Sequence, residues 1–141
     1  MNSRLNMALR EKHGFVYSIG AQYVPFTDTG LFVISFGTEP SQMKKGVTLV
    51  KQELKKLRDE PLGVKQLASS KEQILGQIAM AEENNMSFMI MMARNLLDQG
   101  RVTSLEEIFE RVRITSARTL QELSNEMFNE RKMSYLMMEP L

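Results

Sequence analysis

The chain has 141 residues, a length that suits one domain built around a single hydrophobic core. Its 18 lysines and arginines almost balance its 17 aspartates and glutamates, which argues against a nucleic-acid partner because such a partner requires a basic face. Cysteine is absent and histidine occurs once, which excludes disulfides, a cysteine nucleophile and a histidine-based metal site formed by this chain alone.

The first elements are predicted to be a short helix and a hairpin. The helix covers residues 3–13, with Ser3 as its N-cap, and Gly14 suits the left-handed conformation that ends a helix. Alternating apolar residues then predict a strand over about 15–24, and an apolar run predicts a second strand over 31–36. Six turn-forming residues join the two strands, which favours an antiparallel hairpin. The second strand is apolar on both faces, so we expect it to be central and covered on both sides.

The middle of the chain has a helical pattern. Pro40 opens an amphipathic helix whose apolar residues recur every three or four positions, and Pro61 breaks it. A long helical region is predicted over about 64–99, with an interruption near Asn84-Asn85, and Gly100 ends it.

The last third is predicted to contain two short helices and a strand. Residues 103–107, with the sequence TSLEE, have the pattern of a capping box that starts the first of these helices. Thr115 starts the second helix, and the apolar run over 132–138 predicts a third strand.

Three strands and about five helices predict an α+β fold in which helices pack on a mainly antiparallel sheet. A sheet of three strands is narrow for so many helices, and the chain starts on a helix. We therefore expect residues 1–141 to form a single partial domain whose first strands lie upstream. The unpaired sheet edge of such a fragment would invite a homodimer. The most hydrophobic stretch, residues 86–93, is too short to span a bilayer, so we expect a soluble protein in the cytoplasm, the periplasm or an organelle matrix.

Arg10 and Tyr17 are the candidate substrate-binding residues. Arg10 falls near the end of the first helix and Tyr17 near the start of the first strand, so a guanidinium and a phenol can converge on one spot. Both groups donate hydrogen bonds to an anionic or carbonyl oxygen. No acid, metal ligand or nucleophile accompanies them. Taken by itself, this pattern favours a solvated surface arginine and a tyrosine packed on the core over a binding site.

Several segments resemble, in chain order, the C-terminal domain of insulinase- or pitrilysin-type zinc peptidases, a family that includes the mitochondrial processing peptidases. This is the domain that does not bind zinc. The resemblance covers nearly the whole chain, and the segment around Arg10 is its most specific part. The matching segments are residues 1–5, 9–18, 28–32, 37–40, 99–101 and 104–107.

The resemblance implies a clamshell of two similar α+β domains that close around a peptide. Zinc is bound in the other domain by a His-x-x-Glu-His motif, which is absent here. The resemblance therefore implies no metal ligand, no catalytic base and no cofactor in this chain, and no proteolysis by the chain alone. By position, Arg10 and Tyr17 correspond to the arginine and tyrosine with which active members contact the substrate near the scissile bond.

Two functions are implied by the resemblance. The first is the half of a zinc metallopeptidase that does not bind zinc, which binds a peptide or protein substrate and stabilises the oxyanion, with zinc on a partner domain or subunit. The alternative is a catalytically inactive peptidase-like domain that serves as a structural or peptide-holding subunit.

Overall fold

The computed structural model describes residues 3–82 and 85–139, without the side chain of Glu82. The chain divides into two compact units, which are Met1–Glu60 with Glu122–Leu141, and Pro61–Gln121. The expectation that residues 1–141 form a single partial domain stays a prediction.

The first unit begins with the expected helix, which has π rather than α geometry over η1 (Asn6–Lys12). Ser3 is its N-cap as predicted, because its Oγ accepts a hydrogen bond from the backbone N–H of Asn6 at 3.2 Å. Gly14 ends the helix with a φ of +61°, the left-handed value predicted for it. The next N–H, that of Phe15, donates to the carbonyl of Leu9 at 2.9 Å. This bond closes the helix end over Leu9, which is fully buried.

The predicted hairpin is confirmed as β1 (Ser18–Pro25) and β2 (Gly30–Gly37), which run antiparallel. The register pairs Ser18 with Gly37 at the base and Pro25 with Gly30 at the turn. β1 begins three residues later than expected, because the chain leaves the helix through Gly14 before it pairs with β2. Gly30 has a steric role, since a Cβ there would lie 2.2 Å from the hydroxyl oxygen of Tyr23.

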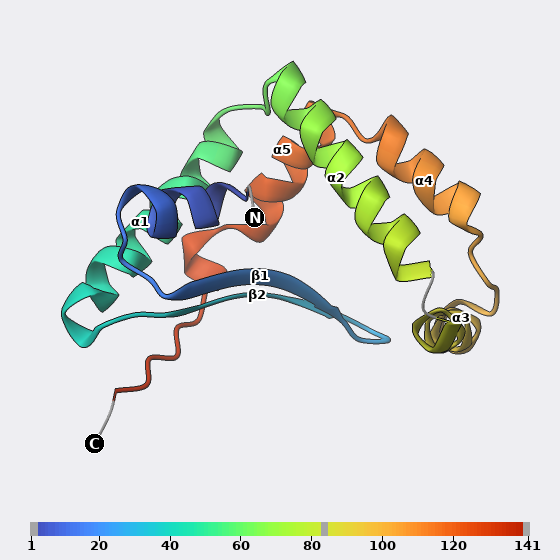
Figure 1. Ribbon diagram of the computed structural model, residues 1–141, viewed down its shortest axis with the longest axis horizontal. Helices are drawn as coiled ribbons and strands as arrows, with labels where there is room; N and C mark the ends of the chain where they lie inside the picture. The colour runs from blue at the N-terminus through green and yellow to red at the C-terminus, as the bar shows by residue number, and fades with distance from the viewer. Residues whose placement is uncertain (1–2, 83–84, 140–141) are drawn as a thin grey trace. The chain divides into compact units, whose positions relative to one another are not determined.

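The helix after the hairpin is confirmed as α1 (Met43–Asp59), and a short 3₁₀ turn, η2 (Pro40–Gln42), precedes it. Glu60 takes an extended conformation that ends α1 before Pro61, as expected for a residue that precedes proline. α1 also contacts η1, and both helices lie on the same side of the hairpin (Figure 1). Gly46 of α1 faces β2, and a Cβ there would lie 2.9 Å from the ring of Phe36. Glycine therefore permits close packing of α1 on the strand.

Two expectations for the sheet are wrong for the described residues. Residues 133–139 form no strand and follow a 3₁₀ turn, η3 (Glu130–Lys132). β2 is also not central, because in the part of the chain that the structure describes it pairs only with β1. Its residues Leu31 and Phe32 are exposed, although the Phe32 ring contacts Phe128 with centroids 5.2 Å apart. An apolar run becomes a strand only where a neighbouring strand completes its backbone hydrogen bonds, and a central strand needs a neighbour on both sides. Among the described residues, β2 has a strand neighbour on one side and residues 133–139 have none.

The second unit is helical, with α2 (Val64–Glu82), α3 (Asn85–Gln99), α4 (Leu105–Ile114) and the start of α5 (Ala117–Met127). α2 contacts both α3 and α4. The predicted interruption near Asn84-Asn85 falls partly on residues 83–84, which lie outside the described residues, and α3 begins at Asn85. Gly100 ends α3 with a φ of +70°, as predicted. No helix among the described residues is long and apolar enough to cross a membrane.

The predicted capping box starts α4, but only half of it forms. Ser104 Oγ accepts a hydrogen bond from the Glu107 N–H at 3.2 Å. The Glu107 carboxylate instead accepts two hydrogen bonds from Arg101, at 2.8 and 2.9 Å, and one from Arg111 at 2.7 Å. Hydrogen bonding from Arg101 is the largest cause that lowers the pKa of Glu107, to about 2. Arg101 thus joins the loop before α4 to the first turn of that helix, and Arg111 joins the first turn to the last.

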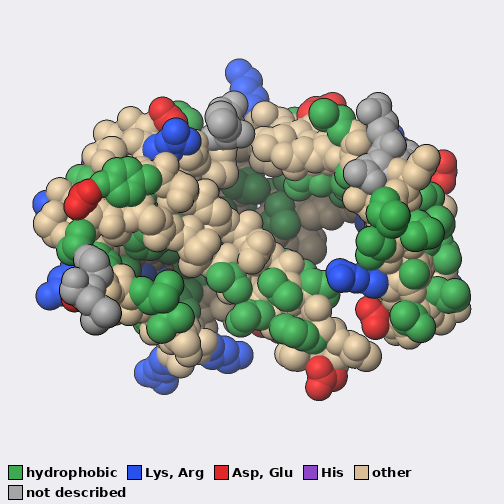
Figure 2. All heavy atoms as spheres, turned by 60° about the horizontal axis from the view of Figure 1, so that its bottom comes forward, with side chains coloured by type: hydrophobic (Ala, Val, Ile, Leu, Met, Phe, Trp, Pro, Cys, Tyr) green, Lys and Arg blue, Asp and Glu red, His purple; other side chains and the backbone are tan. Residues whose placement is uncertain are grey.

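Apolar side chains are largely exposed. Among the described residues the buried hydrophobic ones are Leu9, Val16 and Leu54, all in the first unit. Many large hydrophobic residues are open to solvent on the face that Figure 2 displays. Methionines account for several of these exposed side chains, namely Met7, Met80, Met86, Met89, Met137 and Met138.

We expect Glu107→Gln to lower the melting temperature at neutral pH, because it removes the carboxylate that pairs with Arg101 and Arg111. A pKa lowered from 4.5 to about 2 in the folded state gives stability that is fully present above pH 4.5 and lost as the pH falls towards 2. Thermal melts followed by circular dichroism from pH 7 downward should therefore show the variant and wild type converging below 4.5. Glu106→Gln is the control, since Glu106 lies in the same first turn but has no side-chain partner among the described residues.

The proposed homodimer through the sheet edge stays a prediction that sedimentation can test. We expect concentration-dependent association, because the outer edges of β1 and β2 have no strand partner within the described residues. Ala21→Lys puts a charge on β1 and should shift the chain towards monomer, whereas Ala68→Lys on the exposed surface of α2 should not. A wild-type chain that sediments as a monomer at high concentration contradicts the expectation.

Candidate functional site

Arg10 lies in the last turn of η1 and is exposed. Its backbone carbonyl is occupied, because it accepts hydrogen bonds from the N–H groups of His13 and Gly14. Its guanidinium forms no hydrogen bond or ion pair within residues 3–82 and 85–139. Leu9 beside it is fully buried, so the helix is anchored through one residue and presents the next one to solvent. Arg10 therefore offers its donors to a ligand without first breaking a contact.

Tyr17 lies between the helix and β1, where its backbone is already tied to the hairpin. Its N–H donates to the carbonyl of Gly37 at 2.8 Å, one residue beyond the Ser18–Gly37 pair. The side chain is 65% exposed, so the phenol can reach a ligand in solvent. The structure thus gives both predicted residues exposed side chains on the segment that leads from η1 into β1. It shows no contact between the two side chains.

Glu39 is a third member of the site that the sequence did not reveal. The Tyr17 hydroxyl donates a hydrogen bond to Glu39 Oε1. That bond raises the pKa of Tyr17, because a phenolate would lose the hydrogen bond and lie beside a second negative charge. Tyrosine has a single O–H, and in this structure it points to Glu39. The hydrogen bond that Tyr17 could donate to an anionic ligand is therefore already used.

The backbone of residues 37–40 holds Glu39 across from Tyr17. The hydroxyl of Thr38 donates to the carbonyl of Phe15, which joins the two chain segments beyond the end of the hairpin. The Glu39 carbonyl accepts the N–H of Gln42 at 2.9 Å, and Pro40 has the fixed φ of a first helical residue. These contacts fix the backbone from which the Glu39 side chain reaches Tyr17.

The register explains how Glu39 could have been found. The Pro25–Gly30 pair closes a four-residue turn, and continuing the register past the Ser18–Gly37 pair sets Tyr17 opposite Thr38, with Glu39 as the next residue along the chain. Spacing along the chain carries no such signal, because the two residues are 22 positions apart. In the sequence, Glu39 belongs to the segment 37–40, which carries part of the family resemblance.

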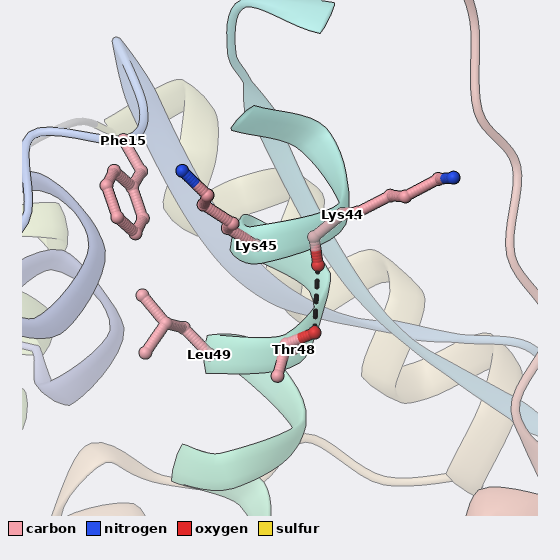
Figure 3. A pocket seen from close by; sticks show the side chains of 5 residues that line it. All are labelled: Phe15, Lys44, Lys45, Thr48 and Leu49. Atoms are coloured by element: carbon pink, nitrogen blue, oxygen red, sulfur yellow. Dashed lines mark hydrogen bonds between the residues drawn. The ribbon is translucent and has the colours of Figure 1, made fainter. Parts of the chain in front are cut away.

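A shallow depression of about 320 Å³ lies beside the helix end. It is lined by Phe15, Lys44, Lys45, Thr48 and Leu49. The Phe15 ring stacks on His13 with centroids 5.3 Å apart, and the Lys45 Nζ lies 5.7 Å from its centroid, whereas Lys44 extends away (Figure 3). These contacts attach the segment between Arg10 and Tyr17 to α1.

The described residues contain no group of three histidine, cysteine, aspartate or glutamate side chains that could hold a metal ion. The one histidine, His13, stacks on the ring of Phe15. What the site offers is hydrogen-bond donors and one carboxylate. Such groups can bind and orient a peptide, and they can stabilise charge on its carbonyl oxygen.

Residues 1–74 match the family described as Peptidase M16 inactive domain, and this range includes Arg10, Tyr17 and Glu39.

Curated relatives include the uncharacterized zinc protease YmxG of Bacillus subtilis (strain 168), which is 28% identical over 92% of this chain and 32% of its own length. An uncharacterized zinc protease of Rickettsia bellii (strain RML369-C) is 26% identical over 92% of this chain and 31% of its own length. The chain thus spans about a third of the length of these relatives.

The fold is also similar to a solved structure. A chain of complex III2 from Candida albicans, determined with Inz-5 bound, superposes with a TM-score of 0.79 over 89% of this chain and 30% of that chain. The sequence identity is 19%, so this similarity concerns the fold alone. It confirms the expected α+β fold class.

We expect Glu39→Gln to lower the pKa of Tyr17 towards its ordinary value of 10.0, because the substitution removes the negative charge and weakens the hydrogen bond. Phenolate absorbance during an alkaline titration measures this shift. The chain has three tyrosines, and a background with Tyr23→Phe and Tyr135→Phe leaves Tyr17 as the one that titrates.

Glu11→Gln is the matched control, because Glu11 lies next to Arg10, is exposed, and has no side-chain partner among the described residues. An identical titration in wild type, Glu39→Gln and Glu11→Gln would show that Tyr17 and Glu39 do not interact in solution.

Proposed function

This chain belongs to the peptidase M16 family as its inactive domain, and we propose that it forms the substrate-holding half of a zinc metallopeptidase. It is a peptidase-like domain without the catalytic half of the site. The observation that supports a substrate-holding role most directly is Arg10, whose guanidinium is exposed at the end of η1 without a side-chain partner among the described residues. The partner domain or subunit would hold the zinc.

The zinc of the partner would activate water and polarise the peptide carbonyl. The residues of this chain would bind and orient the peptide beside it. As negative charge develops on the carbonyl oxygen, Arg10 and Tyr17 would donate hydrogen bonds to that oxygen. A preorganised donor of this kind contributes about 2.7–4 kcal/mol to stabilising a transition state. A peptide or protein is therefore the proposed substrate.

The alternative is a structural or peptide-holding subunit in an assembly that does not cleave peptides. The description of the matched family as inactive favours it, as does the large exposed apolar surface, which a partner would cover. A His-x-x-Glu-His motif in the same protein or in a partner would favour the enzyme, and its absence from both would favour the structural role.

We expect Arg10→Ala to lower kcat/KM for peptide cleavage by the complete protein or complex about 10²- to 10³-fold, because it removes a donor to the developing oxyanion. Tyr17→Phe should also lower kcat/KM, because it removes the second proposed donor. Peptide cleavage under steady-state conditions measures both effects. Under the alternative, both substitutions should leave turnover by the complete protein or complex little changed.

Lys12→Ala is the control, since Lys12 is an exposed cation in the same last turn of η1. Lys12→Ala removes one positive charge, as Arg10→Ala does, but leaves the proposed donors Arg10 and Tyr17 in place. Chelator-sensitive proteolysis by the purified 141-residue chain would contradict the proposed division of the site between two parts.

A further inference from the structure

The proposed role of Tyr17 meets a chemical constraint in this structure. A phenol carries one O–H, and the Tyr17 hydroxyl uses it to donate a hydrogen bond to Glu39 Oε1. The same O–H cannot at the same time donate a second hydrogen bond of full strength to a substrate oxygen. A hydrogen bond from Tyr17 to the substrate therefore has to compete with the hydrogen bond from Tyr17 to Glu39.

The arrangement that brings Tyr17 and Glu39 together is part of the fold. Tyr17 is fixed by the hydrogen bond from its N–H to the Gly37 carbonyl, and Glu39 follows Gly37 by two residues, just beyond the end of β2. The Thr38 hydroxyl closes the same end of the hairpin on Phe15. Neither side chain has to leave its own segment to meet the other. The hydrogen bond therefore defines a resting state of the site.

We propose that Glu39 is a positioning residue that holds the Tyr17 hydroxyl away from the substrate until a substrate carbonyl oxygen displaces it. This inference rests on the proposed function of Arg10 and Tyr17. Arg10 is the donor that is free from the start, so it makes the first contact, and Tyr17 is recruited afterwards. A carboxylate beside the phenol also disfavours a second negative charge there, so Glu39 sets how readily the site accepts an anionic oxygen.

The proposal predicts the effect of removing the charge while keeping the shape. In Glu39→Gln the side chain keeps its length, and the backbone carbonyl still accepts the Gln42 N–H. The amide can donate to the Tyr17 oxygen and so release the phenol proton. We expect the substrate to bind about 2- to 10-fold more tightly, the range set by one net hydrogen bond.

The experiment is a double-mutant cycle on the complete protein or complex that carries this chain. Fluorescein-labelled β-casein serves as the unfolded polypeptide, and its anisotropy reports binding in the presence of a chelator so that no cleavage occurs. The four proteins are wild type, Glu39→Gln, Tyr17→Phe, and the double variant. We expect Glu39→Gln to tighten binding in the wild-type background and to have no effect when Tyr17 is Phe. Glu11→Gln controls for the loss of one negative charge near Arg10.

The outcomes separate this inference from the proposed function. If Tyr17→Phe weakens binding and Glu39→Gln changes nothing, or changes it equally in both backgrounds, the role of Glu39 is overturned and the function of Tyr17 stands. If Arg10→Ala and Tyr17→Phe leave both binding and cleavage unchanged, the proposed function is overturned. In that case the alkaline titration of Tyr17 still reports whether the contact with Glu39 exists.

Discussion

The hydrogen bond from the Tyr17 N–H to the Gly37 carbonyl is the constraint on which the candidate site depends. It carries the register of the hairpin one residue beyond β1, into the segment that arrives from η1. Gly14 reverses the chain just before that point with a positive φ, which residues with a Cβ rarely adopt. One short stretch of backbone therefore positions the helix end that bears Arg10 and the phenol of Tyr17, and the same hydrogen bond brings the segment that carries Glu39 beside it.

Local signals in the sequence predicted most of the elements. Ser3, Gly14 and Gly100 act as helix boundaries because their preferences arise from their own backbone or side chain, and the structure agrees at each of them. The prediction of a third strand was wrong because residues 133–139 have an apolar pattern but no neighbouring strand to pair with among the described residues. The same reason left β2 at an edge. Strand pairing is a long-range property, and an apolar run alone does not determine it.

The candidate site was predictable to a smaller extent. Arg10 and Tyr17 were selected because they match a family motif, and their exposure is consistent with that choice, but their role stays a proposal. Glu39 was missed because its contact with Tyr17 appears only when the hairpin register is known. The π geometry of η1 was also missed. It depends on a shift of hydrogen bonds by one residue, which apolar periodicity over so short a segment does not resolve.

The exposed methionines have a consequence for the chemical durability of the protein. The chain has 12 methionines and no cysteine, so thioethers are its oxidisable sulfur atoms. Oxidation to the sulfoxide turns a flexible apolar side chain into a polar one. Met86 and Met89 on α3, and Met137 and Met138 near the C-terminus, are open to such attack. Peroxide would therefore make this apolar surface more polar, whereas the buried Leu9, Val16 and Leu54 carry no sulfur to oxidise.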